Sequence, residues 1–441
     1  MTSTCTRLGP TAAAALAYLL LVPGVHAQVL TLTDAIDAAL ATHPVLAAAD
    51  ARVLAAEGAS DAARAARLPA ASVTANLTHF QEPMVVAPLH SLSLGSPPTF
   101  DRSLLQGQLG ALYTLFDGGV RGSRIRGSDA MGEATRAFRG SAEMEVLEQT
   151  ASAYTGTVAA RALLEAARAQ VAALQSERDR AQRHLEAGSA AELEVLRADA
   201  VLQLARAAEA SALARAGLAE RALARAMGLG SEALSSNQLA DLAPRAISPG
   251  ERRQDSPILR QADRSVAAAE ALLSEERGGR LPSVVLGAGV QDFGTATGDH
   301  VLEWRAGVEL SWPLFTGGAQ GASVRRAAAN LDAARAELAG AKLRVDQEID
   351  AARTALVEAD ARLQALEAAV TQWTEVARIE ALALQAGSGE QRDLLRAEAG
   401  LFESRAARVV ARQDAILARV RLARAEGTLT RDWFVESMET R

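Results

Sequence analysis

Residues 304–318 read WRAGVELSWPLFTGG, from Trp304 to Gly318. Up to Trp312, apolar side chains alternate with small or polar ones. The apolar set is Trp304, Ala306, Val308, Leu310 and Trp312, and between them stand Arg305, Gly307, Glu309 and Ser311. This period of two predicts a β-strand with one apolar and one polar face.

The length of this strand fits a lipid bilayer. At about 3.4 Å per residue and a tilt of about 40°, it spans roughly 20 Å. That length approaches the apolar band of about 25 Å in outer-membrane barrels. Trp304 and Trp312 stand at the two ends of the apolar face, which predicts an aromatic girdle. After Gly317 and Gly318, the sequence changes to a long proline-free helix rich in alanine and arginine.

The first 27 residues have the pattern of a secretory signal peptide. Arg7 precedes an apolar run from Ala12 to Val22, and residues 25–27 form a small-residue cleavage site. A buried N-terminal helix is the alternative. The single cysteine, Cys5, would be removed with the signal, so we expect no disulfide and no cysteine metal site in the mature chain.

The overall composition narrows the function classes. Aromatic residues make up 3% of the chain and the net charge is −7, which favours thin helical layers and gives no basic surface for nucleic acid. The histidines are scattered and no nucleophile motif is present, so we expect neither an enzyme nor a cofactor or metal site.

The same order of predicted helices and strands occurs twice along the chain. Pro257 and Pro282 each lie 213 positions after Pro44 and Pro69, and Gly317-Gly318 lies 199 positions after Gly118-Gly119. We therefore predict two repeats, residues 28–255 and 256–441. Each has a helix, a β-hairpin (about residues 72–116 and 283–315) and a helical hairpin (119–228 and 318–427). An equatorial loop (229–255) and a C-terminal tail complete the two repeats.

Each helical hairpin should contain one helix of about 69 residues, on the order of 100 Å long, and a returning helix of about 38 residues. Gly188 and Gly387 suit the left-handed residue that ends a helix. Ser189 with Glu192, and Ser388 with Gln391, have the spacing of capping boxes for the returning helices. At the N-terminal end of the chain, Thr33 is the expected N-cap of a short helix.

Four strands cannot close a barrel, because single-chain barrels begin at eight strands. Open sheet edges are not tolerated in lipid. Either the strands lie outside a membrane, as in a soluble β-sandwich with a helical stalk, or several chains pool them.

The ordered motifs resemble the TolC-like outer membrane efflux proteins over nearly all of residues 30–430. The motifs are Leu30-Thr31-Leu32 with Asp34-Ala35, the Leu-Pro before each β-hairpin, Leu115-Phe116-Asp117-Gly118-Gly119, Trp312-Pro313-Leu314-Phe315-Thr316-Gly317-Gly318, and the two Ala-Gly-Ser tips. The resemblance implies a mixed α and β membrane protein: a homotrimer whose twelve-stranded β-barrel crosses the outer membrane of a Gram-negative bacterium, above an α-helical tunnel in the periplasm. Gly118, Gly119, Pro313, Gly317 and Gly318 would form the junction of barrel and tunnel.

The resemblance also implies a passive exit duct for efflux or type I secretion, driven by an inner-membrane pump through a periplasmic adaptor. The adaptor would dock at the tips, at Gly188, Ser189, Gly387 and Ser388. Acidic rings narrow the tunnel in this family; Asp393 and Glu194 hold such positions here, and Arg396 stands where the next acid would be. Arg396 is three residues from Asp393, which predicts a neutralising ion pair. Leu384 and Gly389 stand where some members carry a latch.

Two other classes of protein also contain long helical hairpins. A periplasmic adaptor should carry compact β-rich domains around one hairpin, whereas this sequence predicts two hairpins and membrane-patterned strands. A coiled-coil spacer without a pore would not need Trp304 and Trp312. The sequence leaves the exported substrate open.

Overall fold

A computed structural model describes residues 29–440 except 87–94, 96–98, 189–190, 231–238, 245–255, 296–297, 299 and 387. The predicted signal peptide, residues 1–27, lies outside the described residues. The elements of the first half are α1 (Leu32–Thr42), α2 (Pro44–Ala65), β1 (Ala70–Val85), β2 (Phe100–Phe116), α3 (Val120–Glu186), α4 (Glu192–Ala226) and β3 (Leu242–Pro244). Those of the second half are α5 (Pro257–Gly278), β4 (Ser283–Thr295), β5 (His300–Ser311), α6 (Ala319–Gln385), α7 (Gln391–Ala425), α8 (Arg431–Ser437) and β6 (Met438–Thr440).

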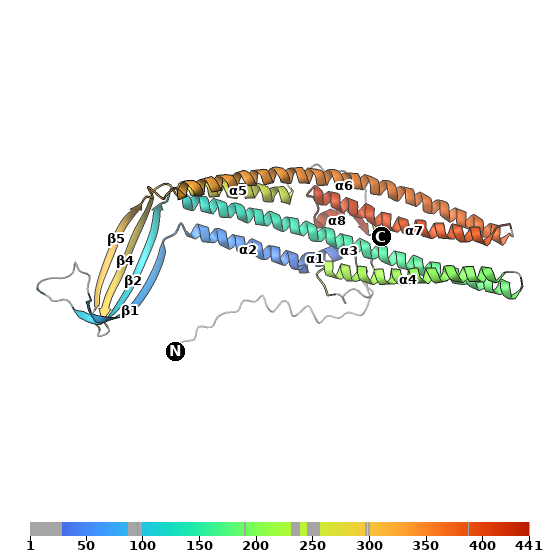
Figure 1. The fold of residues 1–441 in the computed structure, drawn as a ribbon, viewed down its shortest axis with the longest axis horizontal. Coiled ribbons are helices and arrows are strands. Elements are labelled where there is room, and N and C mark those ends of the chain that lie inside the picture. Colours follow the sequence, from blue (N-terminus) through green and yellow to red (C-terminus); the bar gives the residue numbers. More distant parts are fainter. Residues whose placement is uncertain are drawn as a thin grey trace.

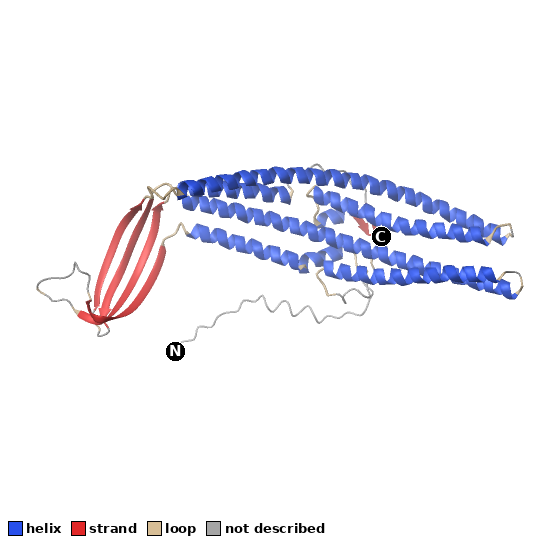
Figure 2. Ribbon diagram, viewed as in Figure 1, coloured by secondary structure: helices blue, strands red, loops and turns tan. Residues whose placement is uncertain are grey.

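The molecule is an elongated helical body with a β-sheet at one end (Figure 1). Helices α3 and α6 run from the sheet to the far end of the body. Helices α2 and α5 lie beside the half nearer the sheet, and α4 and α7 return from the far end beside α3 and α6. Figure 2 shows how sharply the two kinds of structure are separated. None of the helices formed by the described residues is both long and apolar enough to cross a bilayer.

The sheet contains four antiparallel strands in the order β1-β2-β4-β5. β1 begins at Ala70, two residues before the predicted start of the first hairpin, and β2, β4 and β5 lie within the two predicted hairpin ranges.

Corresponding helices of the two halves have equal lengths. α2 and α5 have 22 residues each, α3 and α6 have 67, and α4 and α7 have 35. Their side-chain contacts also correspond. Arg136 pairs with Glu57 at 2.9 Å, and Arg335 pairs with Glu270, their equivalent at the same offsets, at 2.8 Å.

One corresponding pair has its charges exchanged. In the first hairpin, Arg161 of α3 pairs with Glu220 of α4 at 2.6 Å. In the second hairpin, Asp360 of α6 pairs with Arg419 of α7 at 2.9 Å. The two pairs occupy equivalent positions, 199 residues apart, and each joins the two helices of its own hairpin.

The main hydrophobic core lies at the middle of the helical body, where both halves meet. Leu32 and Ile36 of α1, Leu147 of α3 and Phe434 of α8 are all almost fully buried there. The hydroxyl of Tyr154 lies 2.8 Å from the carbonyl oxygens of both Leu30 and Ala240. Burial raises the pKa of this hydroxyl, so it stays a neutral donor that ties the N-terminal segment to the loop after α4.

Three local features differ from the sequence prediction. Thr31, not Thr33, caps α1: its hydroxyl accepts the Asp34 amide at 3.1 Å, and the Asp34 carboxylate accepts the Thr31 amide at 3.0 Å. The segment predicted as a C-terminal tail contains α8 and β6, and β6 pairs with β3 of the equatorial loop. Arg431 of α8 binds Asp37 of α1 through two hydrogen bonds, so the tail is fastened to the core.

Candidate channel surfaces

The outward face of the sheet is apolar across all four strands. Val73, Leu109, Val290 and Trp304 stand opposite one another and form one continuous row. Closer to the helices, the row of Tyr113, Leu286 and Val308 and the row of Phe116, Val284 and Leu310 repeat this pattern. Trp304 is 76% exposed, so this apolar surface is not covered by the chain itself.

The opposite face of the same strands is small and polar. Its rows are Ser72-Gly110-Gly289-Arg305 and Thr74-Gln108-Gln291-Glu303, again read across the strands. Five of these residues line a shallow hollow: Ser72, Gln108, Gly110, Gly289 and Arg305. The predicted alternation of β5 is therefore shared by its neighbours, and the sheet separates an apolar from a polar environment.

On the side away from the helices, the outward face carries both polar and apolar side chains. Beyond the row of Trp304 stand Asp292 and His300, whose Oδ2 and Nδ1 atoms lie 3.1 Å apart, but also the exposed Leu302. At the other end, Trp312 directly follows β5, and its indole N–H donates to the carbonyl oxygen of Arg280 at 3.2 Å. Trp304 therefore does not mark the end of the apolar face, and the girdle of two tryptophans stays a prediction.

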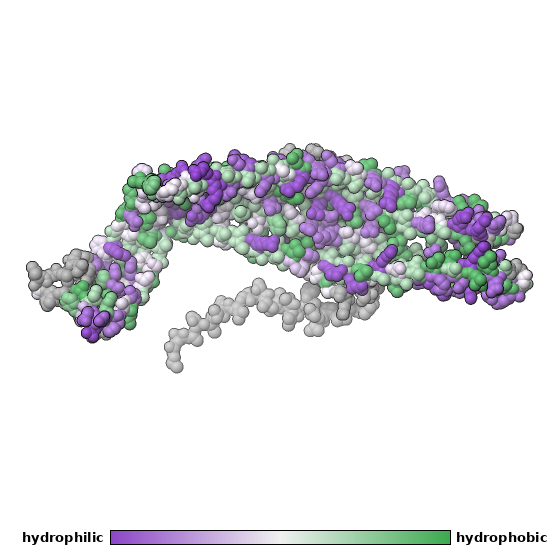
Figure 3. Space-filling view, in the orientation of Figure 1, coloured by the Kyte–Doolittle hydropathy of each residue, from purple (hydrophilic) through white to green (hydrophobic). Residues whose placement is uncertain are grey.

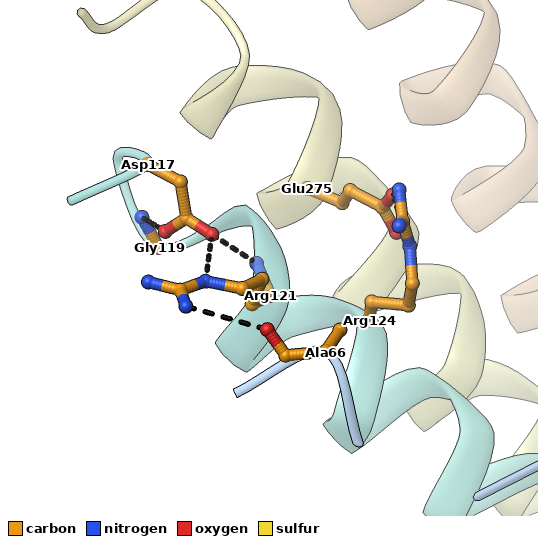
Figure 4. A network of polar contacts seen from close by, with 6 residues as sticks. All are labelled: Ala66, Asp117, Gly119, Arg121, Arg124 and Glu275. Carbon is orange, nitrogen blue, oxygen red and sulfur yellow. Dashed lines mark hydrogen bonds and ion pairs between the residues drawn. The ribbon is translucent and has the colours of Figure 1, made fainter. Parts of the chain in front are cut away.

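The join between β2 and α3 is held by a polar network centred on Asp117 (Figure 4). The carboxylate accepts hydrogen bonds from the Gly119 amide at 3.1 Å and from the amide and Nε of Arg121 at 3.0 and 2.7 Å. Arg121 also donates to the Ala66 carbonyl oxygen at 3.4 Å. Burial alone would raise the pKa of Asp117, but these hydrogen bonds outweigh it and hold the pKa below its ordinary value.

The predicted junction glycines adopt the backbone that requires glycine. Gly118 and Gly119 have φ values of 67° and 86°, and Gly317 and Gly318 have 61° and 88°. Their surroundings differ, however. Gly118 packs against Gly278 at the end of α5, whereas nothing lies within 4 Å of where a Cβ of Gly317 would stand. Pro313 lies in the extended segment between β5 and α6.

The helix tips agree with the prediction only in part. Gly188 has a φ of 73° and ends α3, as expected, while Ser189 and Gly387 lie outside the described residues. The capping-box predictions are wrong, because α4 and α7 begin after Ala191 and Glu390 without a side-chain cap.

Ser388 instead closes the end of α6. Its hydroxyl and its amide both donate to the carbonyl oxygen of Ala383, at 3.2 and 3.0 Å. The amide of Gly389 donates to the same oxygen at 3.0 Å. Gly389 is packed so tightly that a Cβ would stand 3.0 Å from the Leu384 amide nitrogen, so the two latch-equivalent positions form part of this compact turn.

The predicted constriction residues lie in the first two turns of the returning helices. Asp393 pairs with Arg392, its Oδ1 lying 3.4 Å from Nε, and not with Arg396 as the three-residue spacing predicted. Arg392 also reaches Glu390 at 3.2 Å. Arg392 is adjacent to Asp393 along the chain and is exposed, so its side chain can reach the half-buried carboxylate directly. Glu194 is exposed at the equivalent position of α4.

The sequence analysis missed a second acidic cluster farther up the hairpins. Glu177 of α3 is 8% exposed and pairs with Arg180 at 3.0 Å. Glu398 of α7 faces both. Burial and the charge of Glu177 raise the pKa of Glu398, and Arg180 lowers it. Neither glutamate belongs to a recognisable motif, so only the packing of α3 on α7 reveals the pair.

Comparison with known proteins shows which family has this architecture. The family model described as outer membrane efflux protein matches residues 35–229 and 249–428. The curated relatives include Protein CyaE of Bordetella pertussis, 28% identical over 344 residues, which is 74% of this chain and 70% of CyaE. They also include outer membrane efflux protein BepC of Brucella suis, 25% identical over 330 residues, 72% of this chain and 71% of BepC.

Solved structures share the fold. The outer membrane protein VceC of Vibrio cholerae has a TM-score of 0.77 at 22% identity, over 90% of this chain and 96% of VceC. The Campylobacter jejuni CmeC outer membrane channel has a TM-score of 0.76 at 16% identity, over 92% of this chain and 88% of CmeC. The family match covers both halves, and the fold is that of outer membrane channels. The chain therefore belongs to the family of outer membrane efflux proteins.

Proposed function

We propose that three copies of this chain form the outer-membrane channel of a tripartite efflux or type I secretion system. Their sheets would join into one twelve-stranded barrel in the outer membrane of a Gram-negative bacterium. Their helices would continue it as a tunnel across the periplasm. The channel would be a passive duct for substrates that an inner-membrane pump delivers through a periplasmic adaptor.

The observation that carries this proposal is the sheet with an apolar outward face and two edge strands, β1 and β5, that pair with no other described strand on their outer sides. Unpaired amide and carbonyl groups cost several kcal/mol each in lipid, by rough estimate. Edges that meet edges of other copies satisfy these groups. A periplasmic adaptor or a coiled-coil spacer has no use for such a sheet.

The helical body supports a tunnel that reaches far below the membrane. A helix of 67 residues is about 100 Å long. The free tips, with Gly188 and Ser388 at their turns, lie at the end opposite the sheet (Figure 1). Adaptor docking at these tips follows from the proposed orientation, because they are the part of the chain farthest from the outer membrane.

The test is the mass and conductance of the purified protein. In detergent we expect a particle with three chains, and in a planar bilayer we expect ion-conducting channels. A monomer that conducts no ions after reconstitution would contradict the proposal. A matched variant, Trp304→Asp, should insert poorly because it places a charge on the exposed apolar face of the sheet.

A further inference from the structure

This inference rests on the proposed function and concerns the end of the sheet that meets the helices. Two arginines of the second repeat converge there on one point beside α6. A Cβ on Gly321 would lie 3.5 Å from Nη1 of Arg325 and 3.8 Å from Nη2 of Arg280. Because Gly321 has no side chain, a small group can lie between the two guanidinium groups.

The two guanidinium groups have no acidic partner. Among the described residues, the side chains of Arg280 and Arg325 form no ion pair and no hydrogen bond, and both residues are exposed. Glu275 and Glu276 at the end of α5 each pair with another arginine, at 2.6 and 3.3 Å. Two positive charges that converge without a counter-ion repel each other, so this arrangement favours an anion between them.

The corresponding positions of the first repeat are arranged differently. Arg126 lies near Gly122 in the same way, with Nη1 3.6 Å from where a Cβ of Gly122 would stand. Its Nη2 donates to the hydroxyl of Ser123 at 2.9 Å, and the second repeat has Ala322 in place of this serine. No atom of Arg67, the counterpart of the other arginine, lies within 4 Å of that point. The convergence of two unpaired guanidinium groups is therefore specific to the second repeat.

The arginine pair lies at the edge of the apolar face of the sheet. Trp312 continues the outward alternation of β5, and its indole N–H donates to the carbonyl oxygen of Arg280 at 3.2 Å. The neighbouring Leu281 and Leu314 are 49% and 78% exposed. Figure 3 shows hydrophilic side chains over the sheet end of α6, next to hydrophobic ones where β5 joins it. In the proposed orientation, this level is the periplasmic surface of the outer membrane, where lipid headgroups begin.

We propose that Arg280 and Arg325 bind the phosphate group of an anionic phospholipid in the periplasmic leaflet of the outer membrane. Each guanidinium presents paired N–H donors that match phosphate oxygens, so the two groups hold one phosphodiester from two sides. Leu281, Trp312 and Leu314 contact the acyl chains of the same lipid. A zwitterionic lipid fits less well, because its ammonium group is repelled by the two arginines. All of these residues belong to one chain, so each copy holds a complete site.

Binding of soluble short-chain lipids to the purified protein tests this site. The probes are dihexanoyl-phosphatidylglycerol, dihexanoyl-phosphatidylcholine and inorganic phosphate. Each is titrated below its critical micelle concentration in an uncharged detergent, and native mass spectrometry counts the molecules bound to each oligomer. We expect phosphatidylglycerol to bind in preference to both other probes, at one site in each chain.

Three variants assign this binding to the arginine pair. Arg280→Gln with Arg325→Gln should weaken phosphatidylglycerol binding by about 25-fold, which is about fivefold for each arginine near an anionic headgroup. The matched control, Arg67→Gln with Arg126→Gln, removes two charges at the corresponding positions and should change binding by less than about twofold. Gly321→Asp keeps both arginines but places a carboxylate between them, so it should weaken binding about as much as the double variant.

Equal affinity for phosphatidylglycerol and phosphatidylcholine would overturn the proposal. Inorganic phosphate that binds as tightly as the lipid would also overturn it, because the site would then bind a free anion. So would equal weakening by the two arginine pairs. If the double variant does not assemble, Gly321→Asp decides the question, and unchanged lipid binding in Gly321→Asp contradicts the proposed site.

The mass and conductance of the parent protein separate this inference from the proposed function. If the parent protein forms no oligomer and no channel, the proposed function itself is contradicted. If it forms a conducting trimer that does not prefer phosphatidylglycerol, only the lipid site is contradicted.

Discussion

Gly118 and Gly278 touch through their backbones where the sheet meets the helices. A Cβ on Gly118 would lie 2.4 Å from the Gly278 carbonyl oxygen, and a Cβ on Gly278 would lie 2.7 Å from the Gly118 carbonyl oxygen. This contact joins the turn after β2 to the end of α5. It fixes the direction in which the helices leave the sheet.

Gly118→Ala should therefore destabilise the chain more than Gly119→Ala. Both substitutions force alanine into a left-handed backbone, at about 1–2 kcal/mol. Gly118→Ala adds a clash with backbone atoms, about 1–3 kcal/mol more, whereas nothing lies within 4 Å of a Cβ on Gly119. Denaturant unfolding of the two purified variants checks this, and equal midpoints would contradict the contact.

Because β5 has an apolar and a polar face, we expect substitutions at Val308 and Ser311 to have different effects on stability. Val308→Arg places a charge on the apolar face, where it should cost about 2–4 kcal/mol near the bilayer midplane. Ser311→Arg lies on the opposite, polar face and should be tolerated. Unfolding from lipid vesicles measures both, and similar losses of stability would mean that the sheet faces are misassigned.

A second glycine pair tests the packing within the second hairpin. A Cβ on Gly400 would stand 2.9 Å from ring atoms of Trp373, so Gly400→Ala should cost about 1–3 kcal/mol by overpacking. Gly340 has no atom within 4 Å of such a Cβ, and Gly340→Ala should stabilise α6 by about 0.5–1 kcal/mol. Thermal unfolding should move in opposite directions for the two variants.

The pH dependence of the α3–α7 contact follows from the raised pKa of Glu398. Because the packed contact favours the protonated carboxyl, it gains stability as pH falls through that raised pKa and loses it as pH rises. Glu177 and Arg180 are the charged groups that face Glu398 from α3. Distances between spin labels on α3 and α7 should therefore shorten or narrow in acid.

Glu398→Gln should remove this part of the pH dependence, since the amide cannot ionise. The exposed Glu403→Gln on the same helix is the control and should leave the profile unchanged. A pH profile that is the same in both variants and in the parent protein would show that Glu398 does not control the α3–α7 contact.

Ion selectivity tests the role of Asp393. If three copies of this carboxylate ring the tunnel, Asp393→Ala should reduce the preference for cations. Arg392→Ala should raise it, and by more than Arg396→Ala, because Arg392 is the arginine that contacts Asp393. The Arg392 effect should be small, since exposed ion pairs are worth about 0.2–1 kcal/mol. Unchanged reversal potentials in Asp393→Ala would remove this residue from the constriction.

Most of the architecture could be predicted because its sequence signals are either periodic or set by the backbone preferences of single residues. The alternation of apolar and polar residues predicted the two faces of β5, and the absence of proline predicted the long helices. Gly118 and Gly317 indicated the turns between strand and helix. Features set by contacts between distant segments could not be predicted. α8 is only seven residues long, and its Phe434 is buried by α1 and α3, which the local sequence does not indicate.

The candidate site was likewise predicted only in part. Ser388 and Gln391 have the spacing of a capping box, yet the Ser388 hydroxyl bonds backward to Ala383 because the turn brings that carbonyl closer. The three-residue spacing of Asp393 and Arg396 suggested a pair that the nearer Arg392 forms instead. Which of two nearby partners a side chain contacts depends on the local backbone geometry, and sequence spacing alone does not give that geometry.

The exchanged charges of Arg161–Glu220 and Asp360–Arg419 affect which helices pair with each other when the hairpins form. If α3 folded back against α7 in place of α4, Arg161 would meet Arg419. If α6 took α4, Asp360 would meet Glu220. In the proposed assembly of three copies, twelve long alanine-rich helices would offer many similar surfaces, and these pairs make the swapped hairpins electrostatically unfavourable. A domain-swapped assembly is thereby disfavoured at the moment each hairpin closes.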